Sequence, residues 1–149
     1  EANETTVPLD DPGLSPTEST KPTRTIKLLV AEDNPINQMV TEGLLAAMGY
    51  EVDIVENGRE AVDQSARFSY DLIIMDCEMP EMDGFEATRA IRQREQENGS
   101  RTPILAMTAY AMADELKRTL EAGMDDHVTK PVESKVLKAV LEKWLGVQA

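Results

Sequence analysis

The stretch that decides the fold is DLIIMDCEMPEMDGFEAT, at residues 71–88. It begins with a short apolar run at residues 72–75, whose length and flanking carboxylates predict a strand buried on both faces. Asp76 follows, at the point where a side chain can leave the core and enter a crevice beyond the sheet. Pro80 and Gly84 are turn formers, and apolar residues then recur at helical spacing. The stretch therefore predicts a buried strand that ends in a carboxylate, then an acidic loop and a helix.

Outward from this stretch, apolar runs alternate with helical patterns from Thr25 onward. The runs predict five strands, at residues 26–31, 51–55, 72–75, 103–107 and 126–129. The helical patterns predict five helices, at about residues 35–48, 59–66, 85–94 and 111–122, and from residue 133 or 134 onward. Strands that alternate with helices in this way predict an α/β fold, with a parallel sheet covered by helices on both faces.

The first and last helices have the clearest patterns. Asn34 is the predicted N-cap of the first helix, Pro35 its first residue and Gly49 its end. Its predicted apolar face comprises Ile36, Val40, Leu44 and Met48. The last helix carries an apolar stripe, which core packing explains better than a ligand site does. The stripe comprises Val136, Leu137, Val140, Leu141 and Trp144.

The first 24 residues differ from the rest of the chain. They hold four of the eight prolines, five acidic against two basic residues, and no aromatic residue. Such a segment cannot bury enough apolar surface to order itself. We therefore expect a flexible acidic linker at residues 1–24 and one domain at residues 25–149. The chain starts at Glu1 without a methionine, from which we expect an excised piece of a larger protein.

Composition narrows the functional classes. The formal net charge of -13 argues against direct nucleic-acid binding, which depends on clustered cations. No apolar run is long enough to span a bilayer, and the N-terminus lacks the pattern of a signal peptide. We therefore expect a cytoplasmic location without direct membrane contact. The single cysteine, Cys77, excludes an internal disulfide and is interpreted as a small residue beside Asp76.

Charged and polar residues follow the predicted strands. In a parallel α/β sheet the functional crevice lies beyond the carboxyl ends of the strands. The residues expected there are Glu32, Asp33, Asp76, Thr108 and Lys130. Two carboxylates about 4 Å apart repel by roughly 4 kcal/mol at an effective dielectric of 20, and Lys130 balances only one charge. A hard divalent cation such as Mg²⁺ suits this oxygen-rich group. Asp76 could then act as a nucleophile toward a phosphoryl group, with Lys130 and Thr108 contacting its oxygens.

These residues lie in motifs that resemble those of the receiver domain of two-component response regulators. The motifs are AEDN at residues 31–34, MDCEMPEMDG at 75–84, TA at 108–109 and KP at 130–131, and the resemblance covers about residues 26–145. It implies a flavodoxin-like fold with strand order 2-1-3-4-5. It also implies a phosphoacceptor that takes a phosphoryl group from a histidine. The loop after Asp76 and the motif AGMDD at residues 122–126 are most similar to receivers of hybrid histidine kinases.

The resemblance also implies a role for each site residue. Asp76 would be phosphorylated. Mg²⁺, or Mn²⁺ as a substitute, would be held by Asp33, Asp76 and the main-chain carbonyl of Glu78, with Glu32 helping directly or through water. Thr108 and Lys130 would contact the phosphoryl group.

Two positions of the family pattern stand out in this chain. The switch pairs Thr108 with an inward-turning Tyr or Phe three residues before the lysine, and this chain has His127 there. A histidine is expected to act weakly or in a pH-dependent way. The positions that tune hydrolysis carry Glu78 and Tyr110, and we expect Tyr110 to shield the phosphoryl group from water. The resemblance further implies a cis peptide at Lys130-Pro131.

The expected partners are a histidine kinase, a histidine phosphotransfer protein or both. In this family partners approach the active-site end, so Pro35, Ile36 and Pro131 are the predicted contact residues. We expect a monomer in isolation, and an acceptor that takes part in its own phosphorylation without being a turnover enzyme. Two alternatives stay open at this point: a receiver-like docking module that works without phosphorylation, and a flavodoxin-like enzyme. The sequence has no glycine-rich nucleotide fingerprint, so the donor must be external.

Overall fold

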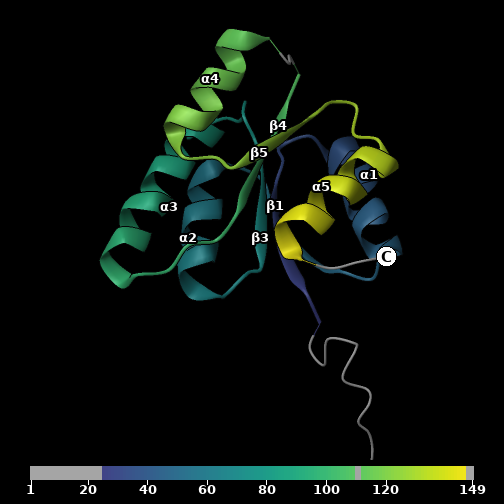
Figure 1. Ribbon diagram of the computed structural model, residues 1–149, viewed down its shortest axis with the longest axis horizontal. Coiled ribbons are helices and arrows are strands. Elements are labelled where there is room, and N and C mark those ends of the chain that lie inside the picture. The colour runs from purple at the N-terminus through teal and green to yellow at the C-terminus, as the bar shows by residue number, and fades with distance from the viewer. Residues whose placement is uncertain (1–24, 110–111, 147–149) are drawn as a thin grey trace, which may run out of the picture.

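The computed structural model describes residues 25–109 and 112–146, and Figure 1 shows strands and helices in strict alternation. The predicted linker at residues 1–24 and the residue Tyr110 lie outside the described residues. The strands are β1 (Lys27–Ala31), β2 (Glu51–Val55), β3 (Leu72–Asp76), β4 (Ile104–Thr108) and β5 (Asp126–Thr129). The helices are α1 (Pro35–Ala47), α2 (Gly58–Arg67), α3 (Gly84–Asn98), α4 (Ala113–Ala122) and α5 (Ser134–Leu145).

The five strands form one parallel sheet in the order β2-β1-β3-β4-β5. This confirms the predicted fold class and the strand order implied by the family resemblance. Strand β1 lies between β2 and β3, so the direction in which strands are added reverses after β2. Such a reversal opens a crevice at the carboxyl ends of β1 and β3.

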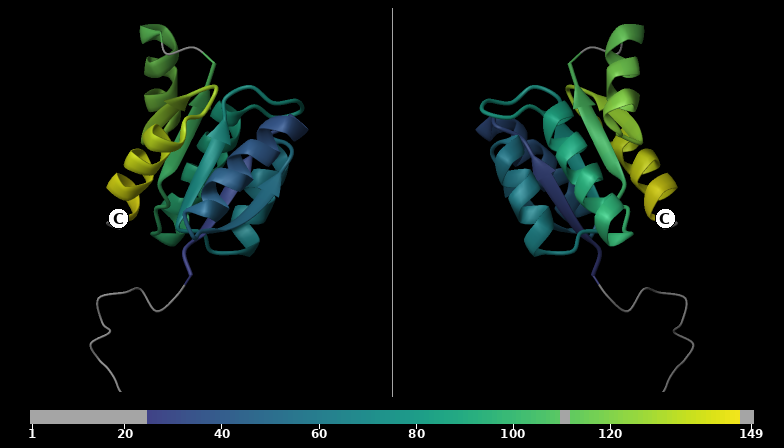
Figure 2. Two further views of the ribbon diagram at one scale, coloured as in Figure 1. Left: turned by 90° about the vertical axis from the view of Figure 1, so that its right-hand side faces the viewer. Right: turned by 90° about the vertical axis from the view of Figure 1, so that its left-hand side faces the viewer.

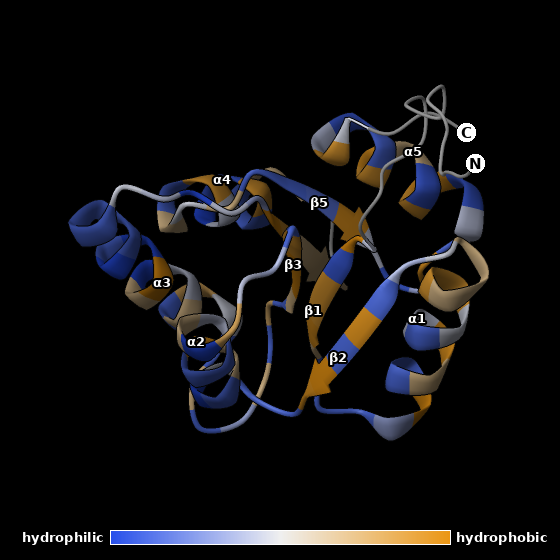
Figure 3. Cartoon of the chain, turned by 90° about the horizontal axis from the view of Figure 1, so that it is seen from below, coloured by the Kyte–Doolittle hydropathy of each residue, from blue (hydrophilic) through white to orange (hydrophobic). Residues whose placement is uncertain are grey.

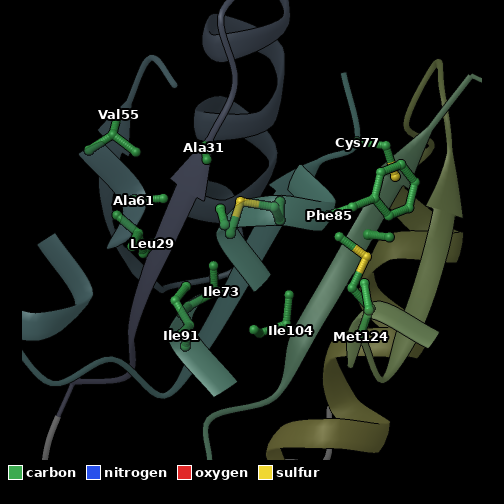
Figure 4. Packing of buried hydrophobic residues seen from close by; sticks show 14 of the residues in the cluster. Leu29, Ala31, Val55, Ala61, Ile73, Cys77, Phe85, Ile91, Ile104 and Met124 are labelled. Carbon is green, nitrogen blue, oxygen red and sulfur yellow. The ribbon is translucent and has the colours of Figure 1, made fainter. Parts of the chain in front are cut away.

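Helices cover both faces of the sheet. Helices α1 and α5 lie on one face, and α2, α3 and α4 lie on the other (Figures 1 and 2). Successive residues of each strand point to opposite faces. In β3, Leu72 and Ile74 therefore join the core under α1 and α5, whereas Ile73 and Met75 join the core under the other three helices. The second core is drawn in Figure 4, where Phe85 lies beside the central strands.

Hydropathy follows this layered arrangement. In Figure 3, β1 and β3 are largely hydrophobic, while the helices alternate between hydrophobic and hydrophilic colours along their length. The edge strand β2 alternates too, because Glu51 and Asp53 interrupt its apolar residues. Strand β3 lies between two other strands, and helices cover both faces of the sheet. All five of its residues are accordingly buried.

Helix α1 has the predicted ends but not the predicted face. The Asn34 side chain accepts hydrogen bonds from the first turn, and Pro35 is the first helical residue. The buried positions are Thr41 and Leu45, with Leu44 and Met48 partly buried. The prediction was wrong for two residues of the apolar face, because α1 packs on the sheet through the line of Thr41 and Leu45. The two exceptions, Ile36 and Val40, are 69% and 47% exposed.

Two other helices differ from the prediction in detail. Helix α5 buries Leu137 and Leu141 as expected, but Val136 is 46% exposed. Helix α3 extends to Asn98, four residues beyond its predicted end. Its last turns are stabilised by Glu95, which is 5% exposed and accepts a hydrogen bond from the loop that follows. Within the described ranges, no helix combines the length and apolar character needed to cross a bilayer.

Candidate functional site

The parallel register brings the predicted site residues to one edge of the sheet. Asp76 lies opposite Met107, which immediately precedes Thr108. Thr108 in turn lies opposite Thr129, which immediately precedes Lys130. The edge where β3, β4 and β5 end thus carries a carboxylate, a hydroxyl and an amine on adjacent strands.

Three carboxylates converge at this edge. Glu32 and Asp33 directly follow β1, and Asp76 ends β3. One carboxylate oxygen from each residue lies within 4.8 Å of those of the other two. Glu32 and Asp76 are 0% and 2% exposed, whereas Asp33 is exposed. The structure therefore brings together the acidic group expected from the sequence, and solvent reaches it through Asp33.

Glu32 is held firmly by the chain around it. Its Oε2 accepts a hydrogen bond from the Asn34 backbone N–H at 3.0 Å, and its carbonyl accepts one from Gln38 Nε2 at 2.6 Å. Its other carboxylate oxygen, Oε1, is buried and has no hydrogen-bond partner among the described residues. That oxygen lies 3.2 Å from Lys130 Nζ, close enough for an ion pair without the geometry of a hydrogen bond.

Lys130 joins two of the three acids. Its Nζ donates a hydrogen bond to Asp76 Oδ2 at 2.8 Å and pairs with Glu32. Burial alone lowers the pKa of Lys130, but the hydrogen bond to Asp76 and the charges of Asp76 and Glu32 together raise it above its ordinary value. One formal positive charge therefore faces three formal negative charges.

The loop after β3 starts with a contact to the central carboxylate. The Glu78 backbone N–H donates to Asp76 Oδ1 at 3.1 Å. The Glu78 side chain is exposed and does not belong to the group of three acids. Further along, Asp83 and Glu86 form a reciprocal capping box at the start of α3. The loop is thus fixed at both ends, and the role of the Glu78 carbonyl stays a prediction.

Two glycines allow this loop to lie close to its neighbours. A Cβ at Gly84 would lie 2.2 Å from the carbonyl oxygen of Asp76. A Cβ at Gly58 would lie 2.3 Å from the carbonyl oxygen of Met82, which accepts a hydrogen bond from the Gly58 N–H at 3.0 Å. From the sequence, Gly84 is predicted only as a turn former, and no role is predicted for Gly58. The available signal was the Asn57-Gly58 dipeptide, which is typical of turns.

The two predicted switch residues lie on neighbouring strands. Thr108 is 1% exposed and donates a hydrogen bond from Oγ1 to Glu115 Oε2 of α4 at 3.3 Å. Glu115 was absent from the sequence-based site. His127 is half-buried in β5, and its Nδ1 lies 3.8 Å from Asp126 Oδ1. Burial raises the pKa of Asp126, but hydrogen bonds from Trp144 and from the His127 backbone outweigh this effect and lower the pKa.

Cys77 has the structural role expected of it. It is 2% exposed and lies between β3 and the loop. Burial, with the nearby charges of Glu115, Asp76 and Glu78, raises the pKa of its thiol to about 12. The thiol is therefore neutral at physiological pH and packs as a small apolar group.

The three predicted contact residues surround the site at the surface. Pro35, Ile36 and Pro131 are all exposed, and Ile36 is 69% exposed at the first turn of α1. The Lys130-Pro131 peptide is cis, as the family resemblance implied. Between α1 and the loop after β5 lies a small cavity of about 80 Å³. Its lining includes Val40, Lys130 and Pro131.

Comparison with known proteins identifies the family. The family model described as "Response regulator receiver domain" matches residues 28–142 of this chain. The chain belongs to the response regulator receiver family. Its relatives include the sensor protein GacS of Pseudomonas syringae pv. syringae, 46% identical over 125 residues that make up 83% of this chain. Another is hybrid signal transduction histidine kinase I of Dictyostelium discoideum, 42% identical over 77% of this chain. The receiver spans a small part of these proteins, 14% of the first and 7% of the second.

Solved receiver structures have the same fold. The receiver domain of the sensor histidine kinase PA1611 from Pseudomonas aeruginosa PAO1 is 44% identical, with a TM-score of 0.76 over 83% of this chain and 100% of that one. That structure has a magnesium ion coordinated in its active-site cleft. The receiver domain of Ssk1 from Saccharomyces cerevisiae, crystallised with the phosphotransfer protein Ypd1, gives a TM-score of 0.79 at 31% identity, over 87% of this chain and 94% of that chain. This receiver is therefore a module of two-component signal transduction.

Proposed function

We propose that Asp76 is the phosphoacceptor of this receiver. The donor is a phosphohistidine of a kinase or of a phosphotransfer protein. A carboxylate oxygen of Asp76 forms a bond to phosphorus, the bond between phosphorus and the imidazole nitrogen breaks, and the imidazole takes up a proton. The acyl phosphate is then passed to a histidine of a phosphotransfer protein or is hydrolysed slowly by water.

The observation that supports this proposal most is the contact of Lys130 with two carboxylates. Its ammonium group lies 2.8 Å from Asp76 and 3.2 Å from Glu32, on the side of the site where Asp76 presents Oδ2. A phosphoryl group on Asp76 would carry negative oxygens next to this ammonium group. Preorganised positive charge at the site of developing negative charge lowers the barrier to phosphoryl transfer. Thr108 Oγ1 is the second proposed contact of the phosphoryl oxygens.

The acidic group fits a divalent cation. Three carboxylates meet within 4.8 Å, and the buried Glu32 Oε1 has no hydrogen-bond partner among the residues the structure describes. We infer that Asp33, Asp76 and the main-chain carbonyl of Glu78 hold Mg²⁺, with Glu32 directly or through water, and that Mn²⁺ can substitute. When bound, the ion neutralises charge on the phosphoryl oxygens during transfer.

Two further residues are proposed to set the lifetime of the phosphorylated state. Glu78 is exposed beside Asp76, and Tyr110 follows Thr108 by two positions. A bulky ring near the acyl phosphate would exclude the attacking water, so Tyr110→Ala is expected to shorten the lifetime. His127 is proposed to complete the switch with Thr108.

The partner is proposed to dock on the exposed apolar start of α1. Ile36 and Met39 are 69% and 72% exposed beside Pro35, and Pro131 lies across the small cavity at the site. The receiver of Ssk1 forms a complex with a phosphotransfer protein, which supports a partner of that class. The relatives of this chain are sensor kinases, so we further propose a hybrid histidine kinase as the parent protein, with this receiver on its cytoplasmic side.

This docking surface can be tested separately from the chemistry. Ile36→Asp is expected to slow phosphoryl transfer from a phosphotransfer protein at least tenfold, because it places a charge in an apolar contact. It should leave labelling by acetyl phosphate unchanged, since a small donor needs no docking. Ala46→Asp, at the exposed far end of the same helix, is the matched control. Equal transfer rates for the two variants would show that the partner does not dock at Ile36.

The phosphoacceptor itself is tested with acetyl phosphate and Mg²⁺. The wild-type protein is expected to acquire an acid-stable, base-labile phosphoryl group, which Asp76→Asn abolishes and EDTA prevents. Glu81→Gln, an exposed acid in the same loop, is the control and should label normally. A folded wild-type protein that binds Mg²⁺ but stays unlabelled would favour the phosphorylation-independent docking module, for which the replacement of the usual aromatic by His127 is the supporting feature.

A further inference from the structure

A fourth acidic residue contacts the site from α4. Glu115 accepts the hydrogen bond of Thr108 Oγ1 through Oε2 at 3.3 Å, and its side chain is only 16% exposed. Its other oxygen lies 3.7 Å from Arg118 Nη1. The Arg118 guanidinium lies 4.2 Å from the centre of the Phe85 ring, which is buried at the start of α3. Glu115 is therefore positioned by Arg118, which lies one turn further along α4 and itself packs against Phe85 of α3.

The Thr108 hydroxyl carries a single proton. It can donate that proton to one acceptor at a time, although its oxygen can accept further hydrogen bonds. In this structure Oγ1 lies 3.3 Å from Glu115 Oε2, so the Glu115 carboxylate is within reach as an acceptor of that proton. Donation to a phosphoryl oxygen on Asp76 would require Thr108 to release Glu115. The two arrangements are therefore mutually exclusive, and both are charge-assisted, because each acceptor carries a negative charge.

We propose that Glu115 is a positioning residue that holds the Thr108 hydroxyl in the unphosphorylated receiver and competes with the phosphoryl group for its proton. This inference rests on the proposed phosphorylation of Asp76. It goes further, because it assigns α4 a part in setting the balance between the two states. Phosphorylation frees the Glu115 carboxylate from β4 and leaves it paired with Arg118, so the charge event at Asp76 reaches α4 through one exchanged hydrogen bond.

The affinity for beryllofluoride, a non-covalent mimic of the phosphoryl group, measures this competition. At saturating Mg²⁺, Glu115→Ala is expected to bind beryllofluoride about three- to tenfold more tightly than wild type, because the hydroxyl no longer has to leave a carboxylate. Glu115→Gln should show a smaller gain, since a neutral amide oxygen is a weaker acceptor. Glu121→Ala, which removes an exposed acid from the other end of α4, should leave the affinity unchanged.

The same measurement in a Thr108→Ala background shows whether Glu115 acts through Thr108. There the effect of Glu115→Ala is expected to fall below twofold, because no hydroxyl is left to compete for. An undiminished gain in that background would overturn the inference, as would wild-type affinity in the Glu115→Ala single variant. Glu115→Gln provides the same comparison if Glu115→Ala does not fold. A wild-type receiver that binds Mg²⁺ but no beryllofluoride would instead contradict the proposed phosphorylation itself.

Discussion

The two edges of the sheet carry charge in opposite ways. At the carboxyl edge, three acids face one lysine within the predicted site. At the amino edge, Arg92 and Arg101 face two acids, Glu95 and Asp125. Arg92 also donates hydrogen bonds to the carbonyls of Gly123 and Thr102, at 2.9 Å and 2.8 Å. This amino-edge network is balanced in charge, whereas the carboxyl edge has an excess of negative charge.

Hydrogen bonding differs in the same sense. At the amino edge, the carboxylates of Glu95 and Asp125 also accept backbone N–H groups, from Thr102 at 2.8 Å and Ile104 at 2.9 Å. At the carboxyl edge, Glu32 and Asp76 also accept backbone N–H groups, but the buried Glu32 Oε1 has an ion pair with Lys130 and no hydrogen-bond partner within the described part of the chain. A network that is satisfied and balanced in charge stabilises the fold, whereas an excess of like charge is costly until a cation relieves it. The charges at the amino edge thus hold α3, β4 and β5 together, whereas those at the carboxyl edge are the ones proposed to take part in phosphoryl transfer.

Loss of Arg92 is expected to have the largest effect on stability. Its side chain is 11% exposed, and Arg92→Ala would leave the buried carboxylates of Glu95 and Asp125 without their main cation. Breaking a buried pair in this way costs about 3–5 kcal/mol in free energy of unfolding. Arg101→Ala is the control, because Arg101 contacts the same Asp125 from a position that is 59% exposed, and it should cost less than about 1 kcal/mol. Urea denaturation of both variants measures this, and equal losses would show that the burial of Arg92 does not increase what its ion pairs contribute.

A methyl group at Gly84 is expected to have the next largest effect, this time at the site. Gly84→Ala would place a Cβ 2.2 Å from the Asp76 carbonyl, so the loop must shift, at a cost of about 1–3 kcal/mol. Because the shift moves the chain around Asp76, the proposed phosphoacceptor, the labelling rate with acetyl phosphate should fall as well. Gly43→Ala is the control: nothing lies within 4 Å of its Cβ in α1, and the change should stabilise by about 0.5–1 kcal/mol. Normal labelling of Gly84→Ala would show that the loop tolerates displacement.

Removing one repelling acid at the carboxyl edge is expected to have a smaller effect, which depends on Mg²⁺. Without Mg²⁺, Asp33→Asn should raise the free energy of unfolding by about 0.5–1 kcal/mol, because the substitution removes one exposed negative charge from a cluster of acids that repel one another. With Mg²⁺ the wild-type protein should become more stable than Asp33→Asn, since the variant binds the ion more weakly and gains less stability from it. Asp63→Asn, an exposed acid of α2, should show neither effect. If Asp33→Asn and Asp63→Asn responded alike to Mg²⁺, the excess charge would have no role in binding.

The sequence predicted one edge far better than the other, and chain connectivity explains why. Glu32, Asp76 and Thr108 each follow an apolar run directly, and Lys130 follows the predicted strand at residues 126–129, so assigning the strands also places these side chains at one edge. The amino-edge network joins residues of α3 to Asp125, 33 residues beyond Arg92, across a packed interface. No local pattern encodes such a contact.

Other features depended on how helices sit on the sheet. The rotation of α1 decides that Ile36 and Val40 are exposed while Thr41 is buried, and an amphipathic pattern defines a face only approximately. The placement of Glu115 beside Thr108 depends likewise on the position of α4. Gly58 matters because another loop approaches it, which only the tertiary structure shows.

The last predicted effect concerns a second hydrogen-bonded cluster at the amino edge, and it appears only at high pH. Tyr70 donates a hydrogen bond to Asp53 Oδ2 at 2.6 Å, and burial together with that bond raises the pKa of Tyr70 to about 12. A group whose pKa is raised on folding contributes stability that is complete below its unfolded pKa of 10.0 and is lost as the pH rises toward the folded value. Between pH 9 and 11, the wild-type protein should therefore lose on the order of 1 kcal/mol more than Tyr70→Phe, which cannot ionise there. Denaturation at the two pH values measures this, and because Lys130 and Cys77 titrate alike in both proteins, their contributions cancel. Parallel loss in wild type and variant would mean that the hydrogen bond from Tyr70 to Asp53 does not raise the pKa of Tyr70 in the folded protein, and that this cluster adds no pH-dependent stability to the amino edge.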